Sequence, residues 1–181
     1  MSDQQTTDMS WSFPVVVGDL PEGGAEFDIT PDEAARAELA RFAGVLAVPS
    51  LRGRLEVRRS GKGAVVDGTI EGTVRQACVV TLEPFDNPFL ETVSLRFSPH
   101  APGAQESEIE IDAAAADPPD PLLNGKVDLA AVIAEFLALT IDPYPRKPGV
   151  EFSAPENTVE KDPSPFAVLE KLKGRLDNGK A

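Results

Sequence analysis

The side chains that most often act as nucleophiles or general bases are scarce in this sequence, which contains one cysteine, Cys78, and one histidine, His100. A cysteine nucleophile needs a nearby base, and a histidine base needs a third group that orients it. His100 stands between prolines in a predicted loop, and Cys78 stands among apolar residues, with Arg75 as the one group that could lower its pKa. We therefore expect a solvated histidine and a buried strand cysteine, with a Cys78–His100 pair as the open alternative.

Three carboxylates, Glu108, Glu110 and Asp112, recur at every second position and would share one face of a strand. A cation site is conceivable there, but the segment has no glycine-containing ligand loop, so a solvated strand face is the preferred interpretation. A lone cysteine does not form a structural zinc site, and no phosphate-binding glycine motif is present. The sequence thus predicts no catalytic residue, no metal site, no cofactor and no small-molecule substrate.

Basic residues gather in positions 51–62, where five cations accompany a single acid, Glu56, giving a local charge of +4 in a chain of net charge −13. Alternate positions of a strand share a face, so three of the arginines should form a row that an arginine of a later strand could join. We name this set the basic stripe: Arg52, Arg54, Arg58, Arg59, Lys62 and Arg75. It could bind an RNA phosphate backbone, or it could pair with the protein's own carboxylates.

The chain as a whole is acidic. A net negative charge repels phosphate backbones and anionic membranes, so composition argues against a general nucleic-acid binder and favours a basic protein as partner. We name the candidate residues for such a partner the acidic segment: Glu106, Glu108, Glu110, Asp112, Asp117 and Asp120. The polar N-terminus, the lack of a long apolar stretch and the single cysteine lead us to expect a cytoplasmic protein without a signal peptide or membrane span.

Apolar spacing predicts one domain over residues 12–176, after a disordered tail at 1–11. A helix is predicted over 30–42, with Thr30 as its N-cap and Glu33 completing a capping box. The elements predicted in this part are an edge strand at 13–17, a loop at 18–27 and this helix, which should bury Ala35, Leu39 and Phe42.

Residues 45–97 change to the period of two that is typical of strands. The glycine-containing turn at 60–63 predicts a hairpin. Gly68 and Gly72 interrupt its second strand, which predicts a bulge or a close backbone approach. The predicted strands run over 51–58, 64–70, 74–82 and 89–97. We expect an α+β fold built on a curved antiparallel sheet or small open barrel, with three helices packed beside it.

Two of those helices are predicted in the last third of the chain. Asp128 is the expected N-cap of a helix over 128–141, which Pro143 ends because the residue before a proline avoids the helical region. A shorter helix is predicted at 165–175. The segments around them are an edge strand at 108–112, an acidic linker at 113–126, a proline-rich extended stretch at 146–163 and a frayed tail at 177–181.

Several short motifs follow one another in the order typical of one protein family. Two glycines in a strand lead to Val-Arg-Gln-Ala-Cys, then to Leu-Glu-Pro-Phe, an acidic linker, a helix and a proline-rich exit. In this succession the chain resembles the YceD family of large ribosomal RNA subunit accumulation proteins across roughly residues 40–176. The matching motif positions are Cys78, Leu82, Glu83, Pro84, Asp128, Glu135, Pro143 and Pro145.

The chain departs from this family at its cysteines. Members typically carry Cys-x-Arg-Cys-Leu, and many add a cysteine pair after the proline exit. Here Val80 and Thr81 stand in place of the arginine and second cysteine, and no cysteine follows the exit. The metal or redox role that cysteine-rich members suggest is therefore not expected in this chain.

The resemblance implies a non-enzymatic factor that supports the accumulation or maturation of large-subunit ribosomal RNA during ribosome assembly. Two modes of action follow. In one, the basic stripe binds the RNA. In the other, the acidic segment and Asp142 hold a basic ribosomal protein before it joins the subunit, without direct RNA contact.

Overall fold

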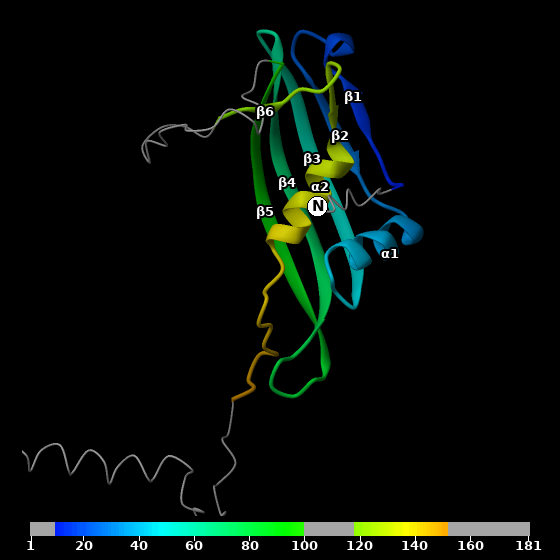
Figure 1. Cartoon of the computed structure of the whole chain (residues 1–181), viewed down its shortest axis with the longest axis vertical. Helices are drawn as coiled ribbons and strands as arrows, with labels where there is room; N and C mark the ends of the chain where they lie inside the picture. Colours follow the sequence, from blue (N-terminus) through cyan, green and yellow to red (C-terminus); the bar gives the residue numbers. More distant parts are fainter. Residues whose placement is uncertain (1–9, 100–117, 152–181) are drawn as a thin grey trace, which may run out of the picture. The chain divides into compact units, whose positions relative to one another are not determined.

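The computed structural model of the protein describes residues 10–99 and 118–151. Its largest element is a curved, open sheet of five strands in the order β2-β3-β4-β5-β6 (Figure 1). Neighbouring strands are antiparallel, apart from β5 and β6, which are parallel. The α+β class and the curved, mostly antiparallel sheet are confirmed, and the sheet does not close into a barrel. The strands are β2 (Ala25–Ile29), β3 (Ala47–Ser60), β4 (Gly63–Ala77), β5 (Pro84–Ser98) and β6 (Asp120–Pro121).

The predicted hairpin forms the centre of this sheet. β3 and β4 pair up to a turn at Gly61, whose φ of +59° suits a residue without a side chain. Along β3, Leu55 and Val57 are buried while Arg54 and Arg58 are exposed, as the alternation predicts. We call the face that carries Leu55 the inner face and the one that carries Arg54 the outer face.

The two glycines of β4 mark close approaches of neighbouring backbones. The φ of Gly68 is +154°, and a Cβ atom there would lie 2.1 Å from the carbonyl oxygen of Arg54. A Cβ atom at Gly72 would lie 2.6 Å from the carbonyl oxygen of Ser50. The close approach is confirmed, but the predicted interruption is wrong. Because glycine keeps the ladder intact, the two predicted strands are one strand that ends at Ala77.

Helix α1 (Glu33–Phe42) confirms the predicted helix but not its cap. Asp32 is the N-cap, and its Oδ1 atom accepts a hydrogen bond from the backbone N–H of Ala35 at 2.8 Å. A carboxylate at this position also interacts favourably with the helix dipole, which favours Asp32 over Thr30.

The predicted buried face of α1 is correct at Ala35 and Leu39 and wrong at Phe42, which is 39% exposed. Leu39 and Ala40 are the buried residues at the helix's contact with β3. Phe42 lies on the same side of the helix as Ala35 and Leu39, but it is the last residue of α1, where the buried face ends.

Strand β2 occupies part of the predicted loop at 18–27, so that prediction is wrong. Phe27 stands opposite Leu55 of β3 on the inner face, and Asp28 stands opposite Arg54 on the outer face. Residues 25–29 alternate apolar and acidic side chains, a pattern that indicates a half-buried edge strand. The low strand propensity of the acidic residues weakens this indication, which explains why a loop was predicted.

A second, two-stranded sheet pairs β1 (Pro14–Val16) with β7 (Lys126–Asp128), and a single 3₁₀ turn, η1 (Val17–Asp19), follows β1. This confirms the predicted edge strand. The described part of the predicted linker, residues 118–126, contains β6 and the start of β7, and its Leu122 is buried. Leu122 also donates its backbone N–H to the carbonyl of Ser98 at 2.9 Å, which attaches this segment to the main sheet.

The predicted N-terminal tail is in contact with the fold at its last two residues. Ser10 donates to the carboxylate of Glu38 through its backbone N–H and its hydroxyl, both at 2.7 Å, and Trp11 packs against the core. These contacts were not predicted, because a residue 28 positions away supplies the acceptor.

Helix α2 (Leu129–Leu139) lies over the inner face of the sheet (Figure 1). The predicted apolar stripe is buried at Leu129, Val132, Ile133 and Leu137. Gly53 of β3 gives the helix room, since a Cβ atom there would lie 2.6 Å from Cδ1 of Ile133. The hydrophobic core therefore lies between the inner face, the two helices and β1.

Asp128 is the N-cap of α2, as predicted, and it also holds the N-terminal segment. Its Oδ1 atom accepts from the backbone N–H of Ala130 at 3.0 Å and of Phe13 at 2.8 Å, and its Oδ2 atom accepts from the Ser12 hydroxyl at 2.6 Å. We expect Asp128→Ala to lower the free energy of unfolding by about 1–2 kcal/mol, measured by urea unfolding. Asp128→Asn should keep most of that stability, and equal losses in both variants would contradict the capping role.

The described residues contain two α-helices. The third predicted helix at 165–175, the edge strand at 108–112 and the tail at 177–181 lie outside the described residues. No helix in the described ranges is long and apolar enough to cross a membrane.

Candidate functional site

The basic stripe lies on the outer face of the sheet, where acidic residues of neighbouring strands meet its arginines. Arg52 makes a two-pronged hydrogen bond to Asp28 of β2, with its Nε atom 2.7 Å from Oδ1. Arg75 binds Asp86 of β5 in the same way, with distances of 2.7 and 2.9 Å. This two-pronged geometry is the strongest that an arginine makes with a carboxylate.

The remaining arginines of the row are also paired. Arg58 binds Asp67 of β4 and lies 3.6 Å from Glu56. Arg54 lies 3.5 Å from Glu71, a looser contact. The predicted alignment of these side chains on one face is correct, and the carboxylates of β2, β4 and β5 occupy the cations that an RNA phosphate would need.

These contacts shift the pKa values of both partners. The hydrogen bond to Arg52 lowers the pKa of Asp28 and raises that of Arg52. Hydrogen bonding to Asp86 raises the pKa of Arg75 and lowers that of Asp86, and the bond to Asp67 raises the pKa of Arg58. These shifts favour the charged forms of Asp28 with Arg52 and of Asp86 with Arg75.

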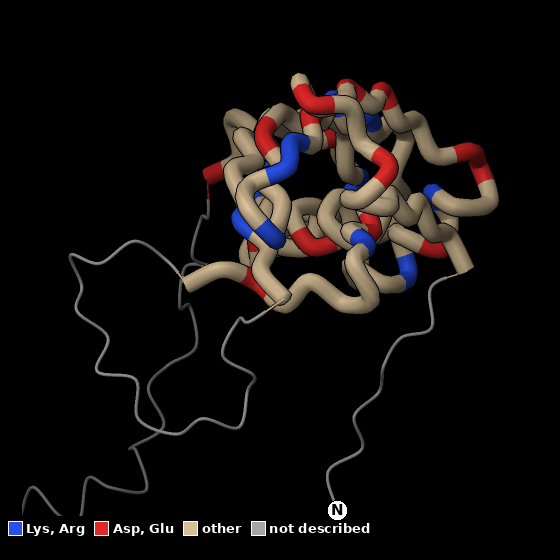
Figure 2. Tube along the Cα trace, turned by 90° about the horizontal axis from the view of Figure 1, so that it is seen from above, with Lys and Arg blue, Asp and Glu red and all other residues tan. Residues whose placement is uncertain are grey.

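The outer face as a whole is close to electrically neutral. Strand register places five arginines and six carboxylates on it, a net charge of −1. Figure 2 shows Lys and Arg positions interspersed among Asp and Glu positions over the described trace. The charged residues of this face are Arg52, Arg54, Arg58, Arg75, Arg96, Glu26, Asp28, Glu56, Asp67, Glu71 and Asp86.

Two members of the basic stripe stand apart from this network. Arg59 donates to the backbone carbonyl of Leu20, and Lys62 lies in the turn between β3 and β4. Neither has a carboxylate partner among the described residues, and the same holds for Arg96 of β5. Lys62 and Arg96 line a small hollow of about 220 Å³ at that end of the sheet.

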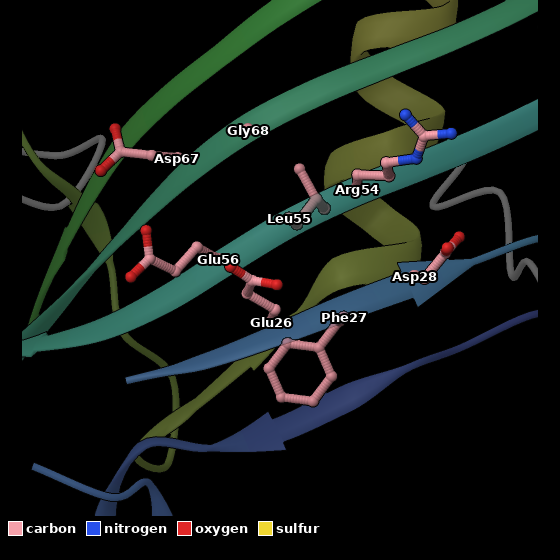
Figure 3. Close-up of a pocket in the computed structure, with 8 residues that line it drawn as sticks. All are labelled: Glu26, Phe27, Asp28, Arg54, Leu55, Glu56, Asp67 and Gly68. Carbon is pink, nitrogen blue, oxygen red and sulfur yellow. The ribbon is translucent and has the colours of Figure 1, made fainter. Parts of the chain in front are cut away.

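Three carboxylates form a row across β2, β3 and β4, with Glu26 directly opposite Glu56 and Glu56 directly opposite Asp67. Figure 3 shows these side chains on one side of the sheet, over a shallow hollow of about 500 Å³, while Phe27 points away from them. Like charges placed opposite one another destabilise a sheet, and Arg58 offsets part of this repulsion. No cluster of three or more metal-binding side chains occurs in the described ranges.

The family-motif residues meet at the end of the β4–β5 hairpin. β4 ends at Ala77, so Cys78 lies in the following turn and not within a strand as predicted. The turn is closed by the Cys78 N–H, which donates to the carbonyl of Glu83 at 2.9 Å, and by Leu82, whose φ is +60°. A non-glycine residue in this left-handed conformation is typical of a turn, and sequence alternation gives no sign of it.

The segment after α2 packs against this turn. Val79 donates its N–H to the carbonyl of Pro145 at 2.9 Å, and the side chain of Lys147 binds Glu83 at 3.0 Å. Gln76 donates to the carbonyl of Asp142 at 2.9 Å. The structure thus brings together two motif regions separated by more than sixty residues, and the predicted extended stretch turns back at Lys147–Val150.

Cys78 is buried, as predicted, but its thiol is not ordinary. The Lys147 N–H lies 3.4 Å from its Sγ atom. This backbone hydrogen bond, followed by that of Thr81, lowers the pKa of Cys78 from 9.0 to about 7. Arg75, the one group that the sequence offered for lowering this pKa, pairs with Asp86 instead, and the donors are mainly backbone groups that a sequence does not reveal. His100, the proposed base, lies outside the described residues.

This thiolate makes stability depend on pH. In the unfolded chain Cys78 keeps its proton up to pH 9, whereas the folded form loses it near pH 7. The stabilisation is complete above pH 9 and disappears as pH falls to 7. We expect the free energy of unfolding of the wild type, relative to Cys78→Ala, to rise between these pH values in urea titrations. A difference that stays constant across that range would contradict the hydrogen-bonded thiolate.

The other predicted site residues have structural positions or lie outside the structure. Pro145 is buried, and Glu135 and Pro143 are exposed. Asp120 is exposed on β6. The rest of the acidic segment (Glu106, Glu108, Glu110, Asp112 and Asp117) lies outside the described residues.

Comparison with known proteins places this chain. No curated protein and no solved structure matches it. A family model described as "Large ribosomal RNA subunit accumulation protein YceD" matches residues 66–173. That range covers more than half of the chain, and it includes both segments that meet at the Cys78 turn. The protein belongs to the YceD family.

Proposed function

We propose that this protein is a non-catalytic factor that supports the accumulation of large-subunit ribosomal RNA by holding a basic protein, in the manner of an assembly chaperone. The family description supplies the RNA whose accumulation is supported. The observation that favours a protein partner is the pairing of Arg52, Arg54, Arg58 and Arg75 with carboxylates of adjacent strands. These arginines are already paired, which leaves little positive potential for phosphate.

Charge supports the same choice. The chain carries a net charge of −13, and its outer face is close to neutral. Binding of a phosphate backbone to such a surface would gain little from counterion release. The net negative charge of the whole chain would attract a basic ribosomal protein. The non-catalytic assignment is consistent with Cys78, whose buried sulfur would have to be uncovered before it could attack a substrate.

Direct RNA binding is the second candidate, and one feature favours it. Lys62 and Arg96 line the same hollow, and neither has a carboxylate partner among the described residues. Two free cations could bind a phosphate group at the end of the sheet, although they supply no aromatic surface for stacking bases.

A binding experiment with variants separates these modes. Large-subunit RNA fragments would be titrated with wild type, Arg54→Gln/Arg58→Gln and Lys62→Gln/Arg96→Gln over a range of salt concentrations. We expect weak RNA binding that the first variant leaves unchanged, because its arginines are already occupied. The second variant has the same charge change and tests the second candidate, because tight RNA binding that only this variant weakens would favour a phosphate site at Lys62 and Arg96. Tight binding with a salt slope that falls in the Arg54→Gln/Arg58→Gln variant would overturn the proposal.

A further inference from the structure

Among the described residues, the edge of the main sheet along β5 has no pairing partner over most of its length. β5 pairs with β4 from Pro84 to Phe97, but β6 reaches it at only two positions, Phe97 and Ser98. In the part of the chain that the structure describes, no strand pairs with the other side of β5 between Pro84 and Arg96. Figure 1 shows this strand at the margin of the sheet, with β6 beside its end.

The direction of the free backbone groups follows from one hydrogen bond. The carbonyl of Ser98 accepts from Leu122, so even-numbered residues of β5 direct their N–H and C=O groups to this edge, because these groups alternate sides along a strand. Leu90, Thr92, Ser94 and Arg96 therefore each present a donor and an acceptor there. Their side chains are exposed on the outer face.

Only part of the edge is protected against pairing. Pro84 and Pro88 are also even-numbered and have no N–H group, so they oppose pairing along the N-terminal half of β5. Pro118 and Pro119 precede β6 and cannot donate to an extension of that strand. The stretch from Leu90 to Arg96 contains no proline, glycine or lysine, and its one inward-pointing charge, Glu91, opposes pairing with any strand that lacks a cation beside it.

Glu91 indicates what the edge accepts. Its side chain is half-buried on the inner face, on the same side as Phe89 and Val93 and opposite the fully buried Ile70. It makes no hydrogen bond or ion pair with any described residue. A carboxylate in apolar surroundings without a partner is costly, and a cation on a neighbouring strand would remove that cost.

Charge separates three possible occupants of this edge. The chain's own segment from Glu106 to Asp112 would bring further carboxylates beside Glu91. A second copy of β5 would pair even positions with even positions, which leaves Glu91 beside an apolar residue such as Val93 or Leu95 and brings together two chains of charge −13. A basic segment of another protein would supply hydrogen-bond partners for the backbone groups of the edge and a cation for Glu91.

We propose that the β5 edge from Leu90 to Arg96 binds an extended segment of a basic protein as an added strand, with a lysine or arginine of that segment beside Glu91. This inference rests on the proposed function, because it identifies how the basic partner is held. Main-chain hydrogen bonds would supply affinity, and the cation beside Glu91 would supply specificity.

The test uses a nine-residue peptide in which threonine alternates with valine and a lysine replaces the central valine. A second peptide carries glutamate in place of that lysine. Amide hydrogen exchange by NMR should show new protection at Leu90, Thr92, Ser94 and Arg96 with the lysine peptide, and none at Val93, whose N–H already faces β4. Absence of protection at these four amides with millimolar peptide would overturn the proposal.

Two variants test the backbone and the charge separately. Thr92→Pro removes an edge donor without touching the β4 ladder and should weaken peptide binding about tenfold, while Thr92→Ala should bind normally. Glu91→Lys should reverse the preference, so that the glutamate peptide binds better than the lysine peptide. Glu26→Lys makes the same charge change on the opposite edge strand, β2, and should leave the preference for the lysine peptide unchanged. Peptide affinities that are the same in wild type, Glu91→Lys and Thr92→Pro would overturn the proposal.

The proposed function and this inference fail in different ways. If a ribosomal protein co-purifies equally with wild type and Thr92→Pro, the edge is not its binding site, although the function remains. If the peptide binds as described but no ribosomal protein co-purifies from cells, the edge is correct and the proposed function is wrong.

Discussion

Gly68→Ala is expected to lower the free energy of unfolding by about 3 kcal/mol or more, because two separate costs add. The φ of Gly68 is +154°, a conformation that residues with side chains rarely adopt. Its Cβ atom would also lie 2.1 Å from the carbonyl oxygen of Arg54 and 2.9 Å from the Cα atom of Leu55. Backbone atoms cannot move aside as a flexible side chain can, so β3 and β4 would have to separate. Urea unfolding followed by circular dichroism measures the loss.

A matched control separates strain from contact. Gly44 also has a positive φ, +67°, but nothing lies within 4 Å of a Cβ atom there. Gly44→Ala should therefore cost only about 1–2 kcal/mol, the price of the left-handed backbone. Equal losses in the two variants would show that the approach of β3 to β4 at Gly68 is less close than described.

Ile133→Ala is expected to lower the free energy of unfolding by about 2–5 kcal/mol. Ile133 is fully buried, and its Cδ1 atom fills the space that Gly53 leaves above β3. The neighbouring backbone cannot collapse into the cavity, because the long β3–β4 ladder holds it in place. α2 also leads directly into the segment that covers Cys78, so alkylation of the Cys78 thiol should become faster in this variant.

Leu139→Ala is the control for this prediction, since Leu139 lies on the same helix and is 74% exposed. Its stability and its rate of thiol alkylation should match those of the wild type. If Ile133→Ala loses stability but Cys78 remains as unreactive as before, α2 does not position the segment that covers the thiol.

The parts of the fold that the sequence predicted are those set by local periodicity. The hairpin around Gly61 follows from alternation and turn chemistry, and the helix after Asp128 follows from an apolar stripe and a cap residue. In each case the residues that decide the structure are neighbours in the chain. The cap of α1 was misplaced by two residues because Thr30 and Asp32 both suit the position, and only the backbone geometry separates them.

The candidate sites depend on contacts between distant segments and were harder to predict. The partner of Arg52 is Asp28, and it could not be identified without β2, whose register brings the two residues together. The lowered pKa of Cys78 requires an N–H group of Lys147, which reaches the thiol only because α2 crosses the sheet first. Sequence similarity indicated that both segments matter, but it did not show that they touch.

The most direct test of the central claim is a tagged pull-down from ultraviolet-irradiated cells, with crosslinked RNA sequenced and bound proteins identified in the same sample. We predict a basic ribosomal protein of the large subunit in stoichiometric amounts, few direct RNA crosslinks, and no change in either with Arg54→Gln/Arg58→Gln. Abundant crosslinks between this chain and large-subunit RNA that disappear in that variant would contradict the account, because they would make the paired arginines an RNA-binding surface.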